Sequence, residues 1–220
     1  MNKNYSAYPS IANSTRRELG WDISGKTSYR INSEGFRGKD FENISVIALG
    51  CSITLGIGVH EEDSWPCILE KKLNKSVANI SKAAAGPDTL FRYASYWIPK
   101  LKPRVVVYCE PPPYRFEVLK KDTSDKKGLF AAYRFGPGQL TDQEYAIQLA
   151  WMKNDLNFEL NYSKNMLAIE KLCDNNKCDF YMFKSSEHFD ADGELGFDDH
   201  HPGPSQQKKF AEFVFNKINS

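Results

Sequence analysis

Hydrophobic positions along the chain fall into short apolar runs separated by helical patterns. Residues 44–49 form a run rich in β-branched side chains that ends at Gly50, which predicts a buried strand. Residues 104–108 give the clearest strand of the chain. Weaker runs at residues 77–80 and 179–183 predict two more strands.

Helices are predicted between these strands. One begins at residues 63–66, where a capping residue is followed by a proline in the first turn. Another opens at residues 88–89 and is ended by Pro99 and Pro103.

Two helical segments complete the pattern, and the alternation predicts the fold class. Residues 141 to about 175 form a long helical region broken once, and a last helix starts near Pro204. Strands that alternate with helices favour an α/β protein with a parallel sheet covered on both faces. Ligands bind beyond the carboxyl ends of such strands, so the segments that follow the strands matter most for function.

The length of 220 residues favours one main domain. We expect residues 1–40 to form an N-terminal arm packed on the body, because they carry Trp21, Tyr29, Ile31 and Phe36. Residues 41–220 would then form the domain, with a long insertion at residues 110–140.

Composition narrows the classes of partner. The net charge of +1 lacks the broad basic footprint of a nucleic-acid binder. No apolar run is long enough to cross a bilayer, and the first residues show no secretory signal. Five cysteines without a CxxC pair, together with the missing secretory signal, indicate reduced thiols, so we expect a cytoplasmic protein. The cysteines and histidines are scattered, not clustered as in a zinc site, and we expect no metal and no cofactor. A loop at residues 190–194 with alternating acidic positions is a weaker candidate for a calcium site.

A glycine-rich turn follows the first predicted strand, at residues 50–58. It lacks the lysine of a phosphate-binding P-loop, the last glycine of a dinucleotide loop and the final glycine of an α/β-hydrolase elbow. With these three motifs excluded, the remaining feature is Ser52, a serine just past a buried strand. Such a serine is either a nucleophile or an ordinary turn residue. Cys51 is a weaker candidate nucleophile.

The loop before the last helix supplies a candidate base and its orienting acid. Asp198 and His201 are three residues apart, so one turn can bring them together. Pro202 favours extended backbone at His201, which would project the imidazole out of the loop. A serine hydrolase needs such a pair beside its nucleophile. A solvated acidic loop with surface histidines is the competing interpretation.

Taken in order, several blocks resemble the SGNH (GDSL-like) hydrolase superfamily. Residues 50–56 resemble its first block, residues 85–87 hold the glycine of its second, and residues 198–202 resemble its closing DxxHP block. Residues 32–38 resemble a lead-in found before the first strand in some bacterial and phage members.

The resemblance implies a flavodoxin-like three-layer α/β/α sandwich and a set of roles. Ser52 would be the nucleophile, His201 the general base and Asp198 its orienting acid. The backbone N–H groups of Ser52 and Gly86 would form the oxyanion hole.

Two departures from the family pattern bear on activity. Cys51 replaces the usual first-block Asp, and residues 109–115 contain no Asn for the third oxyanion donor. Tyr114 or Arg115 would supply that donor, or the hole has only two.

The resulting expectation is an enzyme that cleaves carboxylic esters, such as short-chain or acetyl-sugar esters, through an acyl-enzyme. Its partner would be a small-molecule or glycan ester. Acyl transfer to a sugar stays open. So does a catalytically impaired SGNH-like domain that binds glycan or protein.

Overall fold

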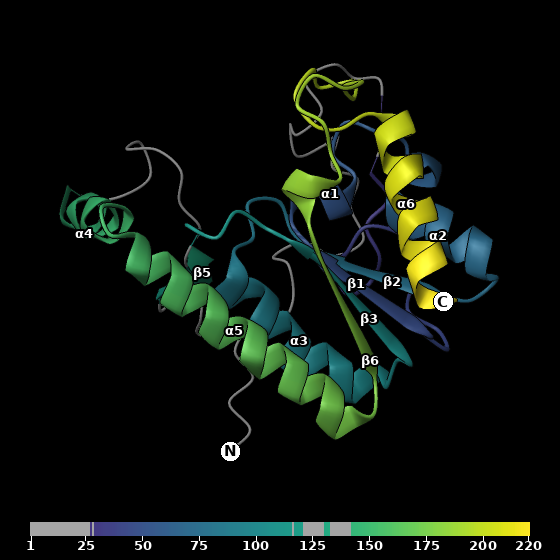
Figure 1. Cartoon of the computed structure of the whole chain (residues 1–220), viewed down its shortest axis with the longest axis horizontal. Helices are drawn as coiled ribbons and strands as arrows, with labels where there is room; N and C mark the ends of the chain where they lie inside the picture. Colours follow the sequence, from purple (N-terminus) through teal and green to yellow (C-terminus); the bar gives the residue numbers. More distant parts are fainter. Residues whose placement is uncertain (1–26, 28, 116, 121–129, 133–141) are drawn as a thin grey trace.

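The computed structural model of the chain describes residues 27, 29–115, 117–120, 130–132 and 142–220. At its centre lies a sheet of four parallel strands in the spatial order β2-β1-β3-β6 (Figure 1). These strands are β1 (Val46–Gly50), β2 (Val77–Ser81), β3 (Val105–Glu110) and β6 (Asp179–Lys184). The four strands predicted from the apolar runs are therefore confirmed.

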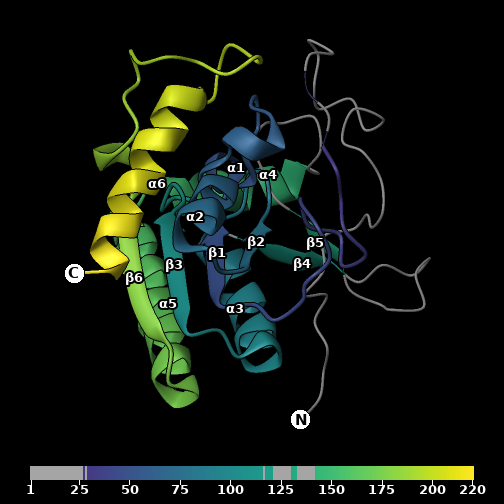
Figure 2. The same cartoon turned by 90° about the vertical axis from the view of Figure 1, so that its right-hand side faces the viewer.

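Helices cover both faces of the sheet and make a three-layer α/β/α sandwich, as predicted (Figures 1 and 2). One face carries α2 (Trp65–Leu73) and α6 (Pro204–Ile218), which pack on each other; the other carries α3 (Pro87–Leu101) and α5 (Asp155–Asn176). Side chains of β1 alternate between the two cores. Ile47 and Leu49 belong to the core under α3 and α5, whereas Val46 and Ala48 belong to the core under α2 and α6.

The prediction that Pro99 ends its helix is wrong. Pro99 lies inside α3, which continues to Leu101 and stops at Lys102 in the left-handed conformation. Because Pro99 is in the last turn, its missing N–H removes one hydrogen bond without preventing the turn from closing. The predicted break in the long helical region is confirmed, since α4 (Asp142–Met152) ends before α5 begins at Asp155.

The arm and the insertion are described in part. Tyr29, Ile31 and Phe36 of the arm are buried, whereas Trp21 lies outside the described residues. Within residues 110–140, β4 (Val118–Lys120) and β5 (Phe130–Ala132) form an antiparallel pair. No helix in the described ranges is long and apolar enough to span a membrane.

The strand order decides where a ligand site can form. The chain leaves β1 for β2 on one side and then crosses to β3 on the other side of β1. In open α/β sheets the crevice at such a reversal, outside the carboxyl ends of the strands, is where ligands bind. The turn that carries Ser52 follows β1 directly, at this crevice.

Candidate active site

The Ser52 turn is a compact structure mounted on the end of β1. Short helix α1 (Ser52–Leu55) is closed by Leu55 N–H donating to the Cys51 carbonyl at 2.9 Å and by Ile57 N–H donating to the Ser52 carbonyl at 3.1 Å. Gly50 is required here, because a Cβ would lie 1.9 Å from Thr54 Oγ1. The glycines that the sequence places around Ser52 therefore serve close packing.

Asp198 and His201 form a hydrogen-bonded pair, so their three-residue spacing does bring the two side chains together. His201 Nδ1 lies 2.5 Å from Asp198 Oδ2. The other carboxylate oxygen accepts the backbone N–H of His201 at 3.1 Å and that of His200 at 3.3 Å. Both side chains of the pair are mostly buried, with 18% of each exposed. The loop itself thus locks the carboxylate against the imidazole.

These bonds also set the charge of the acid. Burial opposes ionisation of Asp198, but the hydrogen bonds from the His201 side chain and from the His201 and His200 backbone outweigh it. The pKa of the Asp198 carboxyl is therefore held below its usual value. An ionised carboxylate only accepts hydrogen bonds, so His201 Nδ1 carries the proton of this bond, and in the neutral imidazole Nε2 is then the acceptor.

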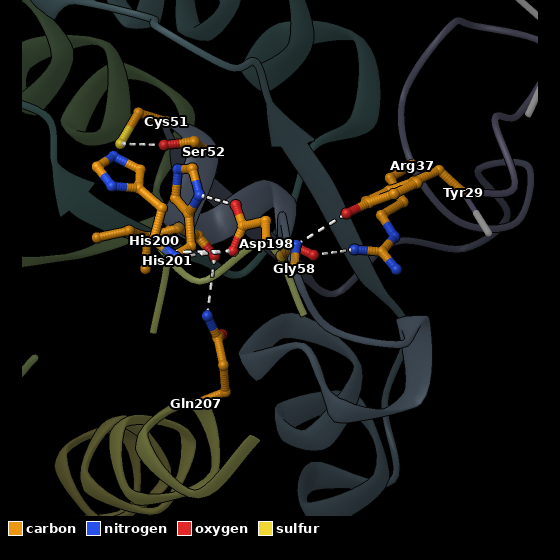
Figure 3. A network of polar contacts seen from close by, with 11 residues as sticks. Tyr29, Arg37, Cys51, Ser52, Gly58, Asp198, His200, His201 and Gln207 are labelled. Carbon is orange, nitrogen blue, oxygen red and sulfur yellow. Dashed lines mark hydrogen bonds and ion pairs between the residues drawn. The ribbon is translucent and has the colours of Figure 1, made fainter. Parts of the chain in front are cut away.

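Ser52 lies near this pair but is not bonded to it. Its Oγ donates to Cys51 Sγ at 3.9 Å, and the structure has no hydrogen bond between the Ser52 and His201 side chains. In the view of Figure 3 the His201 ring lies between Asp198 and Ser52. Contacts to a thiol sulfur are weak, and catalytic hydrogen bonds are often long or absent before substrate binds.

Two backbone N–H groups at the strand ends have no acceptor within the described part of the chain. They belong to Ser52 and to Gly86, the residue that caps α3. Gly86 also permits a close approach, because a Cβ there would lie 2.7 Å from both Cβ and the carbonyl oxygen of Arg115. These are the two groups for which the resemblance implies a role as oxyanion donors.

The structure separates the two candidates for the third donor. Tyr114 is exposed and packs on Phe158 of α5, with ring centroids 6.4 Å apart. Arg115 instead packs against Gly86, and its Nη1 donates to the Ala85 carbonyl at 3.3 Å. Arg115 is thus beside the second-block glycine.

Sequence reasoning missed Gln207, a fully buried side chain of α6. Its Oε1 accepts the N–H of Trp65 at 3.0 Å. Its Nε2 donates to the Ile53 carbonyl at 3.3 Å, the dashed line from Gln207 in Figure 3. Gln207 therefore ties the Ser52 turn to two helices. A glutamine in helical register with the core residues Phe210 and Val214 was the signal that pointed to it.

The other chemical candidates are placed as follows. All five cysteines are free, and Cys51 is buried. The 190–194 loop is held by Gln206, whose Oε1 accepts the Asp190 N–H at 2.7 Å and whose Nε2 donates to the Glu194 carbonyl at 2.8 Å. Among the described residues no group of three or more His, Cys, Asp or Glu side chains is arranged to hold a metal ion.

No protein-family model and no curated protein matches the chain. Among solved structures it is similar to TesA, with 16% identity, a TM-score of 0.42, and coverage of 79% of this chain and 97% of TesA. It is similar to a family 3 carbohydrate esterase of Clostridium thermocellum, at 15% identity and a TM-score of 0.41, covering 80% of this chain and 96% of the esterase. A protein from Desulfitobacterium hafniense DCB-2, described as lipolytic and of the G-D-S-L family, matches at 14% identity and a TM-score of 0.40, covering 78% and 97% of the two chains.

Proposed function

We propose that this protein is a serine hydrolase that cleaves carboxylic esters through an acyl-enzyme. Ser52 is the nucleophile, His201 the general base and then general acid, and Asp198 the acid that orients His201. The observation that carries the proposal is the Asp198–His201 pair, joined at 2.5 Å on a loop beside the Ser52 turn. An imidazole held in one tautomer by a buried carboxylate is the base that an activated serine needs.

The reaction follows from this arrangement. Rotation of the Ser52 side chain moves Oγ from Cys51 Sγ to His201 Nε2, which takes the hydroxyl proton as Oγ attacks the ester carbonyl. The N–H groups of Ser52 and Gly86 donate to the oxyanion that forms. His201 then protonates the departing alcohol. Water repeats the sequence on the acyl-enzyme, releases the carboxylic acid and restores Ser52.

Short acyl groups, such as acetyl on a sugar, are the substrates that we place first, because the sequence shows no long apolar groove. If a sugar hydroxyl replaces water in the second half of the reaction, the same residues perform acyl transfer. The two reactions are distinguished by whether a free acid or a new ester accumulates.

The proposal is tested by covalent labelling with a fluorophosphonate probe. Wild type and Ser185→Ala should be labelled, whereas Ser52→Ala should not, and His201→Gln should be labelled far more slowly because the serine then lacks its base. Ser185 is a suitable control because it follows β6 in a separate short helix. An ester panel with acetyl and longer acyl groups would then define the substrate.

A folded wild-type protein that resists the probe would contradict the proposal. It would favour the second function, a catalytically impaired domain that binds glycan or protein. The observation in favour of that function is that Ser52 Oγ is bonded to Cys51 and not to His201. Binding to glycan arrays and to candidate proteins would then be the decisive measurement.

A further inference from the structure

The loop after the Ser52 turn, residues 55–59, is held by two side chains from before β1. Arg37 donates through Nη1 to the Leu55 carbonyl at 3.0 Å and to the Gly56 carbonyl, and through Nη2 to the Val59 carbonyl at 2.8 Å. Buried carbonyls need donors, and one guanidinium supplies three of them here.

Tyr29, from the same segment before β1, also bonds to the 55–59 loop. Its hydroxyl oxygen accepts the N–H of Gly58 at 2.8 Å, and its ring lies 4.2 Å from the Arg37 guanidinium carbon (Figure 3). Both side chains are almost fully buried. No carboxylate of a described residue hydrogen-bonds to Arg37. The direct contacts of its buried charge are three carbonyls and an aromatic face, and Glu61 and Glu62 act on it only at longer range.

The segment that carries Arg37 is itself rigidly mounted. Asn32 Oδ1 accepts the N–H groups of Glu34 at 3.1 Å and Phe36 at 2.8 Å, which closes a tight turn. Phe36 is buried edge-on against Tyr93 and Trp97 of α3. Arg37 therefore reaches the 55–59 loop from a segment whose backbone is held in place by Asn32 and by the packing of Phe36.

The held loop in turn touches the catalytic acid. The Gly58 carbonyl accepts the N–H of Phe197, the neighbour of Asp198, at 2.7 Å. Gly58 has a φ of +80°, and a Cβ there would lie 2.4 Å from Asp198 Oδ1. The 55–59 loop is thus the surface against which the Asp198 carboxylate rests.

We propose that Arg37 and Tyr29 are positioning residues for the Asp198–His201 pair, acting through the 55–59 loop. They make no contact with the reacting atoms. They hold the 55–59 loop in place, and this loop determines the position of the Asp198 carboxylate. The carboxylate in turn determines the direction in which His201 Nε2 points. The expected effect on rate rests on the proposed function, whereas the expected effect on the Asp198–His201 bond does not depend on it.

Two readouts test this proposal on the full-length protein. The first is the far-downfield proton NMR resonance of His201 Nδ1–H, which reports the short bond to Asp198 whether or not the protein is an enzyme. The second is the rate of labelling of Ser52 by a fluorophosphonate. The variants are Tyr29→Phe, which removes one acceptor and keeps the ring, and Arg37→Lys, which keeps the charge but not the forked donors. Arg37→Met removes both.

Arg30→Met is the matched control, because Arg30 is a nearby, exposed arginine whose side chain hydrogen-bonds among the described residues to Glu61 and to no part of the 55–59 loop. We expect Tyr29→Phe and Arg37→Lys to shift or broaden the resonance and to slow labelling by about 10- to 100-fold, the size of effect that an ångström-scale misplacement produces. Arg37→Met should be slower still, with Arg37→Lys rescuing part of the loss. Arg30→Met should match wild type in both readouts.

The proposal is overturned if the folded Tyr29→Phe and Arg37→Lys variants melt at lower temperature but keep the wild-type resonance and labelling rate, since their role is then structural alone. If Arg37→Met fails to fold, the two milder variants still decide. If wild type is not labelled at all, the hydrolase proposal fails, while the resonance in the variants still decides the positioning role.

Discussion

At the scale of single residues, the site depends on how closely a few atoms approach Asp198. Three donors surround its carboxylate, two from the backbone and one from His201. On the side of the 55–59 loop, the carboxylate meets a glycine Cα where any side chain would collide. The position of the Asp198 carboxylate therefore depends on its hydrogen bonds and also on the lack of a Cβ atom at Gly58.

Gly58→Ala should slow fluorophosphonate labelling by about 10²-fold, because its Cβ would displace the Asp198 carboxylate. The positive φ adds a conformational cost of about 1–2 kcal/mol. Gly38→Ala separates the two effects, since Gly38 also has a positive φ of +117° but nothing lies within 4 Å of an added Cβ. That control should lose stability and keep its labelling rate. An equal loss of rate in both variants would argue against a specific role for Gly58.

Arg115→Met should slow the reaction by about 10²–10³-fold, the usual effect of losing one oxyanion donor. The reason is that the Arg115 guanidinium reaches the Ala85 carbonyl, on the same peptide group as the Gly86 N–H, whereas Tyr114 is exposed and packs on Phe158. Tyr114→Phe is the control and should leave the rate unchanged. Single-turnover labelling rates measure both. If Arg115→Met reacts like wild type, the oxyanion hole has two donors.

At the scale of elements, polar bonds join α3, α5 and the start of the insertion next to Gly86. Glu117 and Arg92 form a buried ion pair at 2.7 Å, with 4% and 9% of their side chains exposed. The Asp88 carboxylate accepts hydrogen bonds from Asn161 at 3.1 Å and Asn165 at 2.9 Å of α5. Because Asp88 lies in the first turn of α3, these bonds hold the end of the helix that Gly86 caps.

Breaking the buried pair should be costly. Arg92→Met leaves Glu117 charged and buried, so we expect a loss of about 3–5 kcal/mol in the free energy of unfolding. The double variant Arg92→Met/Glu117→Met should recover much of this loss, since no unpaired charge remains. Lys171→Met, which breaks an exposed pair with Asp174 on α5, should change stability by only about 0–1 kcal/mol. Urea unfolding of all three checks the prediction, and a double variant as unstable as the single one would contradict it.

At the scale of the whole molecule, the sheet gathers residues that are far apart in the chain. Ser52 follows β1, Gly86 follows β2, and Asp198 with His201 follow β6. Parallel strands place all these segments at one edge, where the strand order reverses between β1 and β3. Gln207 then ties the last helix back to the Ser52 turn across 154 residues of sequence. The site is thus bonded to the folded core through Gln207, so we expect its charges to contribute to the stability of the fold.

The lowered pKa of Asp198 predicts how global stability depends on pH. Its folded pKa lies below the unfolded value of 3.8, so the unfolded chain binds more protons in this range. The contribution of the Asp198 carboxylate to the free energy of unfolding is complete above its unfolded pKa and is lost as pH falls through its folded pKa. The stability difference between wild type and Asp198→Asn should therefore shrink between about pH 5 and pH 2.

Asp199→Asn is the matched control for this measurement. Asp199 is the next residue, and its carboxylate forms no hydrogen bond or ion pair with a described residue. Its variant should keep the wild-type stability in chemical unfolding at neutral pH, because it loses no hydrogen bond or ion pair with a described residue. A difference for Asp198→Asn that stays constant with pH would show that the carboxylate gains nothing from its partners.

The sequence by itself determined the elements and part of the site. Runs of β-branched residues, proline and glycine signals and the three-residue spacing of Asp198 and His201 are local features, and local sterics and hydrogen bonding decide their outcome. Pro99 is the exception. It lies in the last turn of α3 and the helix continues past it, because the proline removes only one hydrogen bond there.

Only the tertiary structure decided how these parts meet. The roles of Arg37, Gly58 and Gln207, the contact of Arg115 with Gly86, and the placement of the Ser52 and His201 side chains without a bond between them depend on which surfaces pack together. The physical reason is that such contacts join residues from 18 to 154 positions apart, where no local pattern constrains the pairing. Packing of the whole core sets those distances, and a shift of one ångström separates a bonded pair from an unbonded one.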